Sequence, residues 1–403
     1  MAIENSSRAS AVKTELERIE VRLIHLSDLH LGKRVNEFSM IEDQKYILNE
    51  ILRIIDEAGA DGVIMAGDIY DKSVAPVEAV VVLDDFLKAL ADRKLPVFII
   101  SGNHDSAERM AFASQLIDMS GIHIAPVYDG QVRKVSLEDE HGIVDIHMLP
   151  FVKPVHVRRA FPDEKITSYN DALKVVIDNM DIDRSHRNVL VTHQFVTGAS
   201  RSDSEEKTVG GTDNVDGSVF EGFDYVALGH IHGPQNISER IRYCGTPLKY
   251  SFSEAAHCKS VTIADLGEGA GGACSLTVST AELVPLHDMV EIRGRYEDLM
   301  DRSTYAGTTL GTDYLHVTLT DEEEVINAMG RLQSVYSNIM KLDYDNRRTR
   351  TGREIEAAAD VNEKTPQELF AELYKQQNNA DMSEEQADLI DSLVRSIWEG
   401  EDK

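Results

Sequence analysis

Five short polar clusters in the first 232 residues each follow a short apolar run, and they contain the residue types that bind divalent metals. The clusters are Asp28-Leu29-His30, Gly67-Asp68-Ile69-Tyr70-Asp71, Gly102-Asn103-His104-Asp105, Thr192-His193 and Gly229-His230-Ile231-His232. Imidazole, carboxylate and one amide oxygen form a ligand set suited to Mn²⁺, Zn²⁺ or Fe²⁺, and no cluster contains a thiolate. Two such cations about 3.5 to 4 Å apart can drive displacement at a phosphate ester. The clusters therefore predict a two-metal phosphoesterase site.

The spacing within the clusters indicates how the ligands would be aimed. Asp28 and His30 are two residues apart, as are His230 and His232, so each pair can point to the same side of an extended segment. Asp68 follows a glycine, which lets the backbone turn sharply beneath the site, and its carboxylate is the natural bridge between two metals.

Asn103 and His104 are adjacent in the sequence, and we predict different roles for them. Asn103 can coordinate through its amide oxygen, whereas the next residue in an extended chain points elsewhere, so His104 is expected to face the substrate. An imidazole with an ordinary pKa near ~6.5 can protonate a leaving oxygen or stabilise a charged phosphorane. Asp71 and Asp105 are expected to orient imidazoles or bound water, with a helix-capping role as the alternative for both.

The apolar runs before the clusters must position them. Each run is about four residues long and rich in Val and Ile, which indicates a buried strand. The runs are 23–26, 63–66, 97–100, 189–191 and 225–228, and helical patterns span 38–58, 76–91, 107–119 and 169–180. This alternation predicts an α/β fold with a largely parallel central sheet flanked by helices. Functional groups collect beyond the carboxyl ends of such strands, so one sheet would gather all five clusters at one rim.

The rest of the chain divides by composition. We expect a polar extension over residues 1–20, a catalytic domain over 21–288, a small α+β capping domain over 289–344, a charged linker over 345–364 and a helical docking segment over 365–403. The capping domain would have strands at 290–293, 314–319 and 339–343 around a helix at 322–336. Thr365 and Ser383 begin capping sequences for two final helices, whose apolar faces could dock a partner or pack on the core. The loop 198–217 could be functional or a surface excursion.

Bulk composition limits the function classes. The 403 residues are 42% hydrophobic, and 70 acidic against 41 basic residues give a formal charge of -29, which opposes unaided binding to a polyanion. Two basic islands, 153–159 and 347–353, partly offset this charge. No apolar stretch predicts a membrane span or a secretory signal, and three scattered cysteines predict reduced thiols in a cytoplasmic protein. No P-loop sequence is present, so ATP dependence would come from a partner.

The motifs resemble the calcineurin-like metallophosphoesterase superfamily and, within it, the SbcD family of exonuclease subunits. The similarity is carried by residues 24–32, 101–106, 223–232 and 243–247. It implies one metal on Asp28, His30, Asp68 and His232, a second on Asp68, Asn103, His193 and His230, and His104 as the catalytic imidazole. It also implies Mn²⁺ dependence, a homodimer, and association with DNA and with the coiled coil of an SbcC-type ATPase.

The family resemblance implies double-strand exonuclease and hairpin or single-strand endonuclease activity in DNA repair and recombination. Two other hypotheses use the same fold. A phosphodiesterase or phosphatase acting on non-DNA esters would need the same metals, but it would have little use for the capping domain, linker and terminal helices. A catalytically inactive scaffold predicts a broken ligand set, and none of the seven ligand positions is missing from the sequence.

Overall fold

The computed structural model describes residues 20–112, 118–205, 214–269 and 273–346, together with parts of the C-terminal segment between 365 and 398. The expected N-terminal extension and charged linker lie almost entirely outside the described residues. Among the described residues, none of the helices combines the length and apolarity that crossing a bilayer requires.

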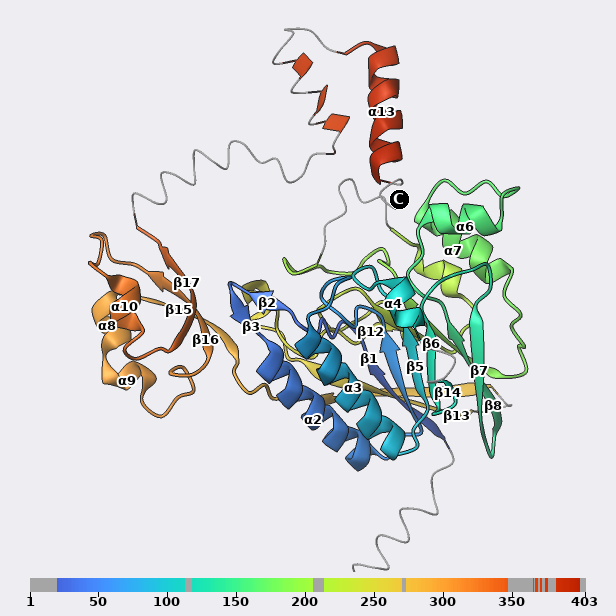
Figure 1. Ribbon diagram of the computed structural model, residues 1–403, viewed down its shortest axis with the longest axis horizontal. Coiled ribbons are helices and arrows are strands. Elements are labelled where there is room, and N and C mark those ends of the chain that lie inside the picture. Colours follow the sequence, from blue (N-terminus) through green and yellow to red (C-terminus); the bar gives the residue numbers. More distant parts are fainter. Residues whose placement is uncertain are drawn as a thin grey trace, which may run out of the picture.

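Over these residues, two six-stranded sheets form the main body (Figure 1). The first has the order β14-β13-β1-β4-β5-β6, with β1 (Val21–Leu26), β4 (Gly62–Ala66), β5 (Val97–Ile100), β6 (Ile122–Ala125), β13 (Ser260–Glu268) and β14 (Cys274–Glu282). Strands β1, β4, β5 and β6 are parallel, whereas β13 is antiparallel to β1 and to β14.

The second sheet has the order β11-β12-β10-β9-β8-β7. Its strands are β7 (Arg133–Asp139), β8 (Gly142–Met148), β9 (Arg187–His193), β10 (Tyr225–Gly229), β11 (Gln235–Asn236) and β12 (Ile241–Tyr243). Strands β8, β9, β10 and β12 are parallel, and the pairing of Gly229 with His193 aligns two of the polar clusters.

The α/β fold with helices flanking its central sheets is confirmed, but the five clusters follow strands of two sheets and not of one. Strands β1, β4 and β5 precede three of the clusters in the first sheet, and β9 and β10 precede the other two in the second sheet. The apolar runs are buried on both faces because each sheet packs one face on the other sheet and the opposite face on other elements. Leu23, Ile64 and Phe98 meet Val189 and Tyr225 in the layer between the sheets. Continuous burial therefore cannot distinguish one covered sheet from two stacked sheets.

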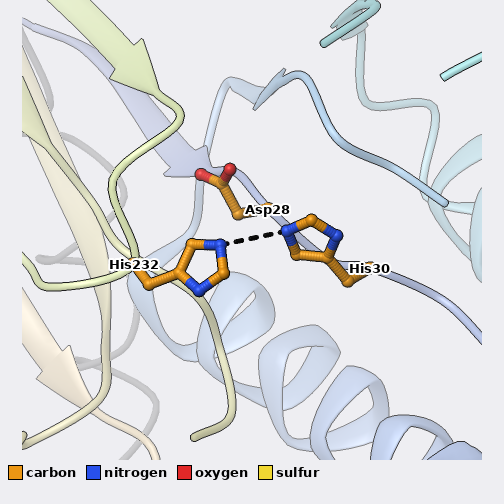
Figure 2. A group of neighbouring side chains, drawn as sticks. All are labelled: Asp28, His30 and His232. Carbon is orange, nitrogen blue, oxygen red and sulfur yellow. Dashed lines mark hydrogen bonds between the residues drawn. The ribbon is translucent and has the colours of Figure 1, made fainter. Parts of the chain in front are cut away.

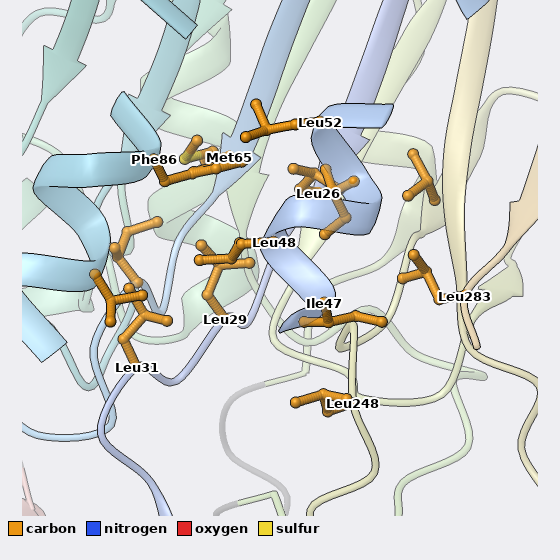
Figure 3. Packing of buried hydrophobic residues seen from close by; sticks show 14 of the residues in the cluster. Leu26, Leu29, Leu31, Ile47, Leu48, Leu52, Met65, Phe86, Leu248 and Leu283 are labelled. Atoms are coloured by element: carbon orange, nitrogen blue, oxygen red, sulfur yellow. The ribbon is translucent and has the colours of Figure 1, made fainter. Parts of the chain in front are cut away.

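Helices cover the outer face of the first sheet. α2 (Ile41–Ala58) and α3 (Val77–Asp92) lie side by side there, and Leu48 and Phe86 pack against Leu26 and Met65 (Figure 3). α6 (Pro154–Ala160) and α7 (Tyr169–Asp178) pack on the second sheet through residues such as Leu173 and Val176. Shorter elements are α4 (Ala107–Ala111), β2 (Arg34–Val35), β3 (Phe38–Ser39), η1 (Gly217–Phe220) and η2 (Phe252–Glu254). Residues 113–117 of the helix expected over 107–119 lie outside the described part.

A separate three-stranded parallel sheet follows the main body. It consists of β15 (Met289–Gly294), β16 (Tyr314–Leu319) and β17 (Asn338–Tyr344), with α8 (Tyr296–Met300), α9 (Arg302–Tyr305) and α10 (Ala328–Leu332). The expected helix over 322–336 is confined to α10, because Asn327 is left-handed (φ 52°) and interrupts it. Asp43 of α2 ties this sheet to the body by accepting hydrogen bonds from the Tyr314 hydroxyl (2.7 Å) and the His287 ring (3.0 Å).

The C-terminal segment contains α13 (Glu384–Trp398). Ser383 and Gln386 cap its start reciprocally, and Thr365 and Glu368 make the same pair of hydrogen bonds, as the sequence predicts. Leu389 of α13 is 59% exposed. The side chains at 369, 373, 397 and 398 lie outside what the structure describes.

Candidate metal centre

The loops that carry the clusters have unusual backbone conformations. Asp28, His30, Asp68 and His230 all have positive φ, between 44° and 100°, although none is glycine. A residue with a side chain has a strained backbone in this conformation, and the strain persists only where the surrounding structure imposes it. Hydrogen bonds from the Asp28 and His30 amides to the carbonyls of residues 67 and 68 impose it here. The strained residues coincide with predicted ligands.

Glycines allow the backbones of the two sheets to meet at this rim. A Cβ on Gly229 would lie 1.9 Å from the Ala66 carbonyl oxygen, and one on Gly102 would lie 2.1 Å from Oδ1 of Asp68. Gly67 has φ +87°, which confirms the predicted turn beneath Asp68. Clusters from both sheets therefore converge on one volume.

Asp28, His30 and His232 form one side of this volume (Figure 2). Their potential ligand atoms lie within 4.8 Å of one another, and all three side chains are buried. The Nε2 atoms of His30 and His232 face each other at 3.1 Å. Two ring nitrogens so placed can share only one proton, whereas a cation between them would use both lone pairs.

Asp68 lies between this group and the remaining predicted ligands. Its Oδ2 is 3.8 Å from Nε2 of His30 and 3.4 Å from Nε2 of His193. On the far side, Oδ1 of Asn103 is 3.0 Å from Nε2 of His193 and 3.0 Å from Nδ1 of His230. Among the described residues, the potential ligand atoms fall into three overlapping groups: Asp28, His30 and His232; His30, Asp68 and His104; and Asp28, Asp68 and His193. His104, predicted to face the substrate, is thus also within ligand distance of His30 and Asp68.

The donor chemistry of these groups fits divalent cations. Nδ1 of His193 donates to the Ala66 carbonyl at 2.8 Å, which leaves the Nε2 lone pair directed at Asp68 and Asn103. Ser204 donates to Glu254 and so can accept from Nδ1 of His232, which leaves the Nε2 of His232 unprotonated. Fixing the tautomer through the second ring nitrogen is typical of metal-binding histidines. The lone pairs converge, and cations would satisfy them.

The pKa shifts within the cluster show that the charges of the protein alone do not balance there. Burial raises the pKa of Asp28 to about 6 and holds the pKa of His30 and of His230 well below the ordinary value. Burial opposes ionisation of Asp68 and His193 as well, but their mutual attraction prevails. This attraction lowers the pKa of Asp68 and raises the pKa of His193 to about 9. Without a cation, a proton on His193 takes its place beside Asp68.

His104 occupies a different position from the other histidines. Its Nδ1 donates to the Asp71 carbonyl at 2.9 Å, and its Nε2 is 3.8 Å from Oδ2 of Asp68. Its side chain is 19% exposed, whereas those of His30 and His193 are at most 1% exposed. The ring therefore lies at the solvent side of the cluster.

The two supporting aspartates have distinct contacts. The Asp105 carboxylate accepts from the backbone amides of Ile69, Tyr70 and Gly102 at 2.9 to 3.1 Å, and so joins two of the ligand loops. These contacts replace the helix-capping alternative for Asp105. Asp71 pairs with Lys33 at 2.7 Å, and its Oδ1 is 3.8 Å from Nδ1 of His30.

Four residues that the sequence motifs did not identify support His232. The His232 amide donates to Glu205 at 2.7 Å, Ser204 contacts its ring at 2.6 Å, and buried Glu254 binds both Ser204 and Lys259. Lys259 also donates to the His232 carbonyl at 2.9 Å. No motif spacing marks these residues. For Ser204 and Glu205 the only signal was the polar character of the loop 198–217, whose residues 206–213 lie outside the described part, and Glu254 and Lys259 lie beyond that loop.

Comparisons with known proteins agree with this geometry. A family model described as calcineurin-like phosphoesterase matches residues 21–234, and one described as type 5 capsule protein repressor C-terminal domain, SbcD_C, matches residues 285–378. The SbcD subunit of the SbcCD nuclease from Staphylococcus epidermidis is 31% identical over 389 residues, which cover 94% of this chain and 100% of that protein.

Solved structures share lower similarity. A dimetal phosphatase from Danio rerio is 12% identical with a TM-score of 0.37, and it covers 64% of this chain and 98% of its own. A Thermus thermophilus protein is 10% identical with a TM-score of 0.36, covering 65% and 99%. From the family models and the Staphylococcus relative, the chain belongs to the calcineurin-like phosphoesterase family and, within it, to the SbcD family.

Proposed function

We propose that this chain is a divalent-metal-dependent nuclease that hydrolyses phosphodiester bonds in DNA, with double-strand exonuclease and hairpin or single-strand endonuclease activity. One observation carries the proposal: Oδ2 of the buried Asp68 carboxylate lies 3.8 Å from Nε2 of His30 and 3.4 Å from Nε2 of His193, so one carboxylate could serve a cation on each side. The relative that is named as part of a nuclease aligns over nearly the whole chain.

In this proposal, one cation is held by Asp28, His30, Asp68 and His232. The other is held by Asp68, Asn103, His193 and His230. When bound, such a pair supplies an activated water and neutralises charge on the phosphate. We propose Mn²⁺ as the cation in the cell because the family resemblance implies it; the mixed nitrogen and oxygen donors, without thiolate, are compatible with Mn²⁺ and also suit Zn²⁺ or Fe²⁺.

His104 is the proposed catalytic imidazole. The Asp71 carbonyl holds Nδ1–H and so fixes the ring, which leaves Nε2 directed at the centre from the solvent side. A proton held at Nε2 can be delivered to the leaving oxygen as the phosphodiester bond breaks. The strained, buried ligands are placed to bind, and the more exposed His104 is placed to transfer the proton.

The decisive test is cleavage of a linear duplex by the purified full chain in Mn²⁺. His104→Gln is expected to lower the rate by about 10²- to 10⁴-fold while both metals remain bound. His141→Gln, a change far from the cluster, is the control. Loss of metal in the His104 variant would make it a ligand, and absence of Mn²⁺-dependent cleavage by the unaltered protein would overturn the nuclease proposal.

The formal charge of -29 favours the alternative that non-DNA phosphate esters are the substrates. A competition experiment distinguishes DNA from small phosphate esters as the substrate. If DNA is the substrate, short duplexes at micromolar concentration should inhibit hydrolysis of bis(p-nitrophenyl) phosphate, whereas an enzyme for small esters would be insensitive to them.

We further propose an SbcC-type ATPase with a coiled coil as the partner, bound through residues 365–403. Leu389 and Leu393 on α13 are 59% and 46% exposed, so this helix presents apolar surface to solvent. Truncation after Asp345 should preserve hydrolysis of bis(p-nitrophenyl) phosphate and abolish co-purification with the ATPase. Retained co-purification would refute this docking site.

Self-association is proposed through the exposed start of α3. Val74, Val77, Val80 and Val81 are each at least 47% exposed, and the spacing of Val77, Val80 and Val81 puts these three on one side of the helix. Val77→Glu should shift the sedimenting species from dimer to monomer, and an unchanged dimer would place the interface elsewhere.

All three cysteines are unpaired, which supports a reducing, cytoplasmic setting.

A further inference from the structure

The first turn of α2 contacts the loop that carries His30. The side chain of Gln44 is buried, with 1% of its surface exposed. Its Oε1 accepts from the Gly32 amide at 2.9 Å, and its Nε2 donates to the His30 carbonyl at 2.8 Å. Because a backbone amide can only donate and a carbonyl can only accept, these contacts also fix which end of the Gln44 amide faces each partner. Gln44 thus bridges the loop from His30 to Gly32.

These contacts hold a strained backbone in place. His30 has φ 44°, a conformation that costs free energy for a residue with a side chain. The Tyr250 hydroxyl adds a further support, because it accepts from Nε2 of Gln44 at 3.0 Å and donates to the Leu29 carbonyl at 2.6 Å. The Tyr250 ring also lies edge-on to the His30 ring, with centroids 5.8 Å apart. The orientation of the His30 imidazole therefore depends on Gln44 and Tyr250.

The residue before Gln44 contacts the three-stranded sheet. Asp43 is also 1% exposed, and its Oδ2 accepts from the Tyr314 hydroxyl at 2.7 Å. Its Oδ1 accepts from the backbone amide and from Nδ1 of His287, at 3.2 Å and 3.0 Å. Tyr314 is the first residue of β16, and His287 lies two residues before β15 (Figure 1). Because a buried carboxylate that loses its donors is costly, these contacts hold the start of α2 against the start of this sheet.

A second set of contacts joins the same two regions. Lys249, the residue before Tyr250, pairs with Asp288 at 2.8 Å and donates to the Ala255 carbonyl at 2.7 Å. The Asp288 amide in turn donates to Asp313 at 3.0 Å, just before β16. The segment that leads into the three-stranded sheet is therefore held by two residues, Asp43 and Lys249, whose next neighbours in the chain support the His30 loop.

We propose that the first turn of α2 positions the metal ligand His30, and that this positioning depends on the docking of the three-stranded sheet. Gln44 is a positioning residue that acts through His30, and Asp43 connects the same turn to the sheet. The inference rests on the proposed role of His30 as a metal ligand. A partner that displaced the three-stranded sheet would then change the affinity for a cation without touching it.

The first test compares Gln44→Met with the unaltered full chain. Methionine has a similar length but makes neither hydrogen bond, so Mn²⁺ binding measured by calorimetry should weaken by about 10- to 100-fold. In the metal-free chain, backbone amides of residues 29–33 should exchange hydrogen at least about tenfold faster. Hydrolysis of bis(p-nitrophenyl) phosphate at saturating Mn²⁺ should return to within about threefold, because His104 is intact. Asn188→Leu, which removes a buried amide at the other end of β9 from His193, is the matched control.

The second test concerns the three-stranded sheet. Tyr314→Phe removes one donor to Asp43 and leaves every side chain of the metal centre in place, and should weaken Mn²⁺ binding by about three- to tenfold. Tyr336→Phe removes a buried hydroxyl that donates to the Leu299 carbonyl next to the same sheet, and should leave the affinity unchanged. In a double variant with Gln44→Met, Tyr314→Phe should have no additional effect, because the contact through which it acts is already lost.

The outcomes separate this inference from the proposed metal centre. If the unaltered chain binds two Mn²⁺ ions and Gln44→Met has the same affinity and the same exchange rates, only the positioning role is overturned. Additive effects in the double variant would overturn the connection through Asp43. Absence of Mn²⁺ binding by the unaltered chain would overturn the metal centre itself. Should Gln44→Met not fold, Gln44→Glu keeps the acceptor for Gly32, loses the donor to His30, and should show the same direction of change.

Discussion

Strand β9 has a buried ionisable residue at each end, and the two ends are satisfied differently. At its start, Arg187 is paired with the Asp139 carboxylate and donates to the carbonyls of Leu266 at 2.8 Å and Gly142 at 2.9 Å. At its end, His193 faces Asp68 and Asn103 in a group with surplus lone pairs. At the first end, protein atoms neutralise the buried charge and leave only Nε of Arg187 without a hydrogen bond, whereas the second end lacks the cations that its lone pairs could bind.

This contrast separates stability from function within one strand. The Arg187 end joins the two sheets, because Leu266 belongs to β13 of the first sheet. The His193 end holds buried charge, strained backbone and facing ring nitrogens, all of which oppose folding of the metal-free protein. Changes at the Arg187 end should therefore leave metal binding intact, and changes at the His193 end should leave the contacts between the sheets at Arg187 intact.

The largest expected effect is at the metal end. Asp68→Asn removes the carboxylate common to both groups, so Mn²⁺-dependent cleavage should fall by at least about 10³-fold and bound metal should fall below two ions per chain. Addition of Mn²⁺ should also raise the melting temperature less than it does in the unaltered protein. Elemental analysis and thermal scans check this, with exposed Asp85→Asn as the control. A variant that still binds two ions would contradict the bridging role.

The next largest effect is at the other end. Arg187→Met leaves Asp139 and two carbonyl groups without their donor, and should lower the free energy of unfolding by about 3 kcal/mol. Metal content should be unchanged. Arg53→Met, which breaks exposed pairs with Glu50 and Glu57, should leave the free energy of unfolding nearly unchanged in the same urea titrations. Equal losses in the two variants would show that β9 is not held at Arg187.

A smaller effect is expected from the support of His232. Glu254 is fully buried, and its contacts with Ser204 and Lys259 fix the His232 ring. Glu254→Gln should weaken Mn²⁺ binding by about 10- to 100-fold, as measured by calorimetry. Exposed Glu57→Gln is the matched control. Unchanged affinity would reduce Glu254 to a packing role.

The smallest effect is the response of the Arg187 end to acid. Burial opposes ionisation of Asp139, but its bonds to Arg187 outweigh burial and lower its pKa below the unfolded value of 3.8. The stabilisation is therefore fully present above about pH 4 and is lost as pH falls through the folded pKa. In chelator, Asp139→Asn should flatten the decline in stability below about pH 4 by under about 1 kcal/mol. An identical decline would exclude this pair as its source.

The sequence predicted the elements of the site better than their assembly. Strand ends located all seven proposed ligands and His104, because each lies directly after an apolar run that could be recognised locally. The division of these strands between two sheets was missed, since burial on both faces looks the same in either arrangement. Ser204 was missed because it contacts His232 and Glu254, which are 28 and 50 residues away in the sequence. Lys259 was missed because it reaches the His232 carbonyl across 27 residues.

The close approach at Gly229 determines how far apart the ligands from the two sheets lie. Because the Ala66 carbonyl occupies the place of a side chain at Gly229, the two sheets touch there through backbone alone. The distance between the ligands that follow β4 and those that follow β10 is then set by the spacing of the two sheets. Enlarging a residue between the layers, such as Ala227, should spread the two halves of the cation pocket without altering a ligand.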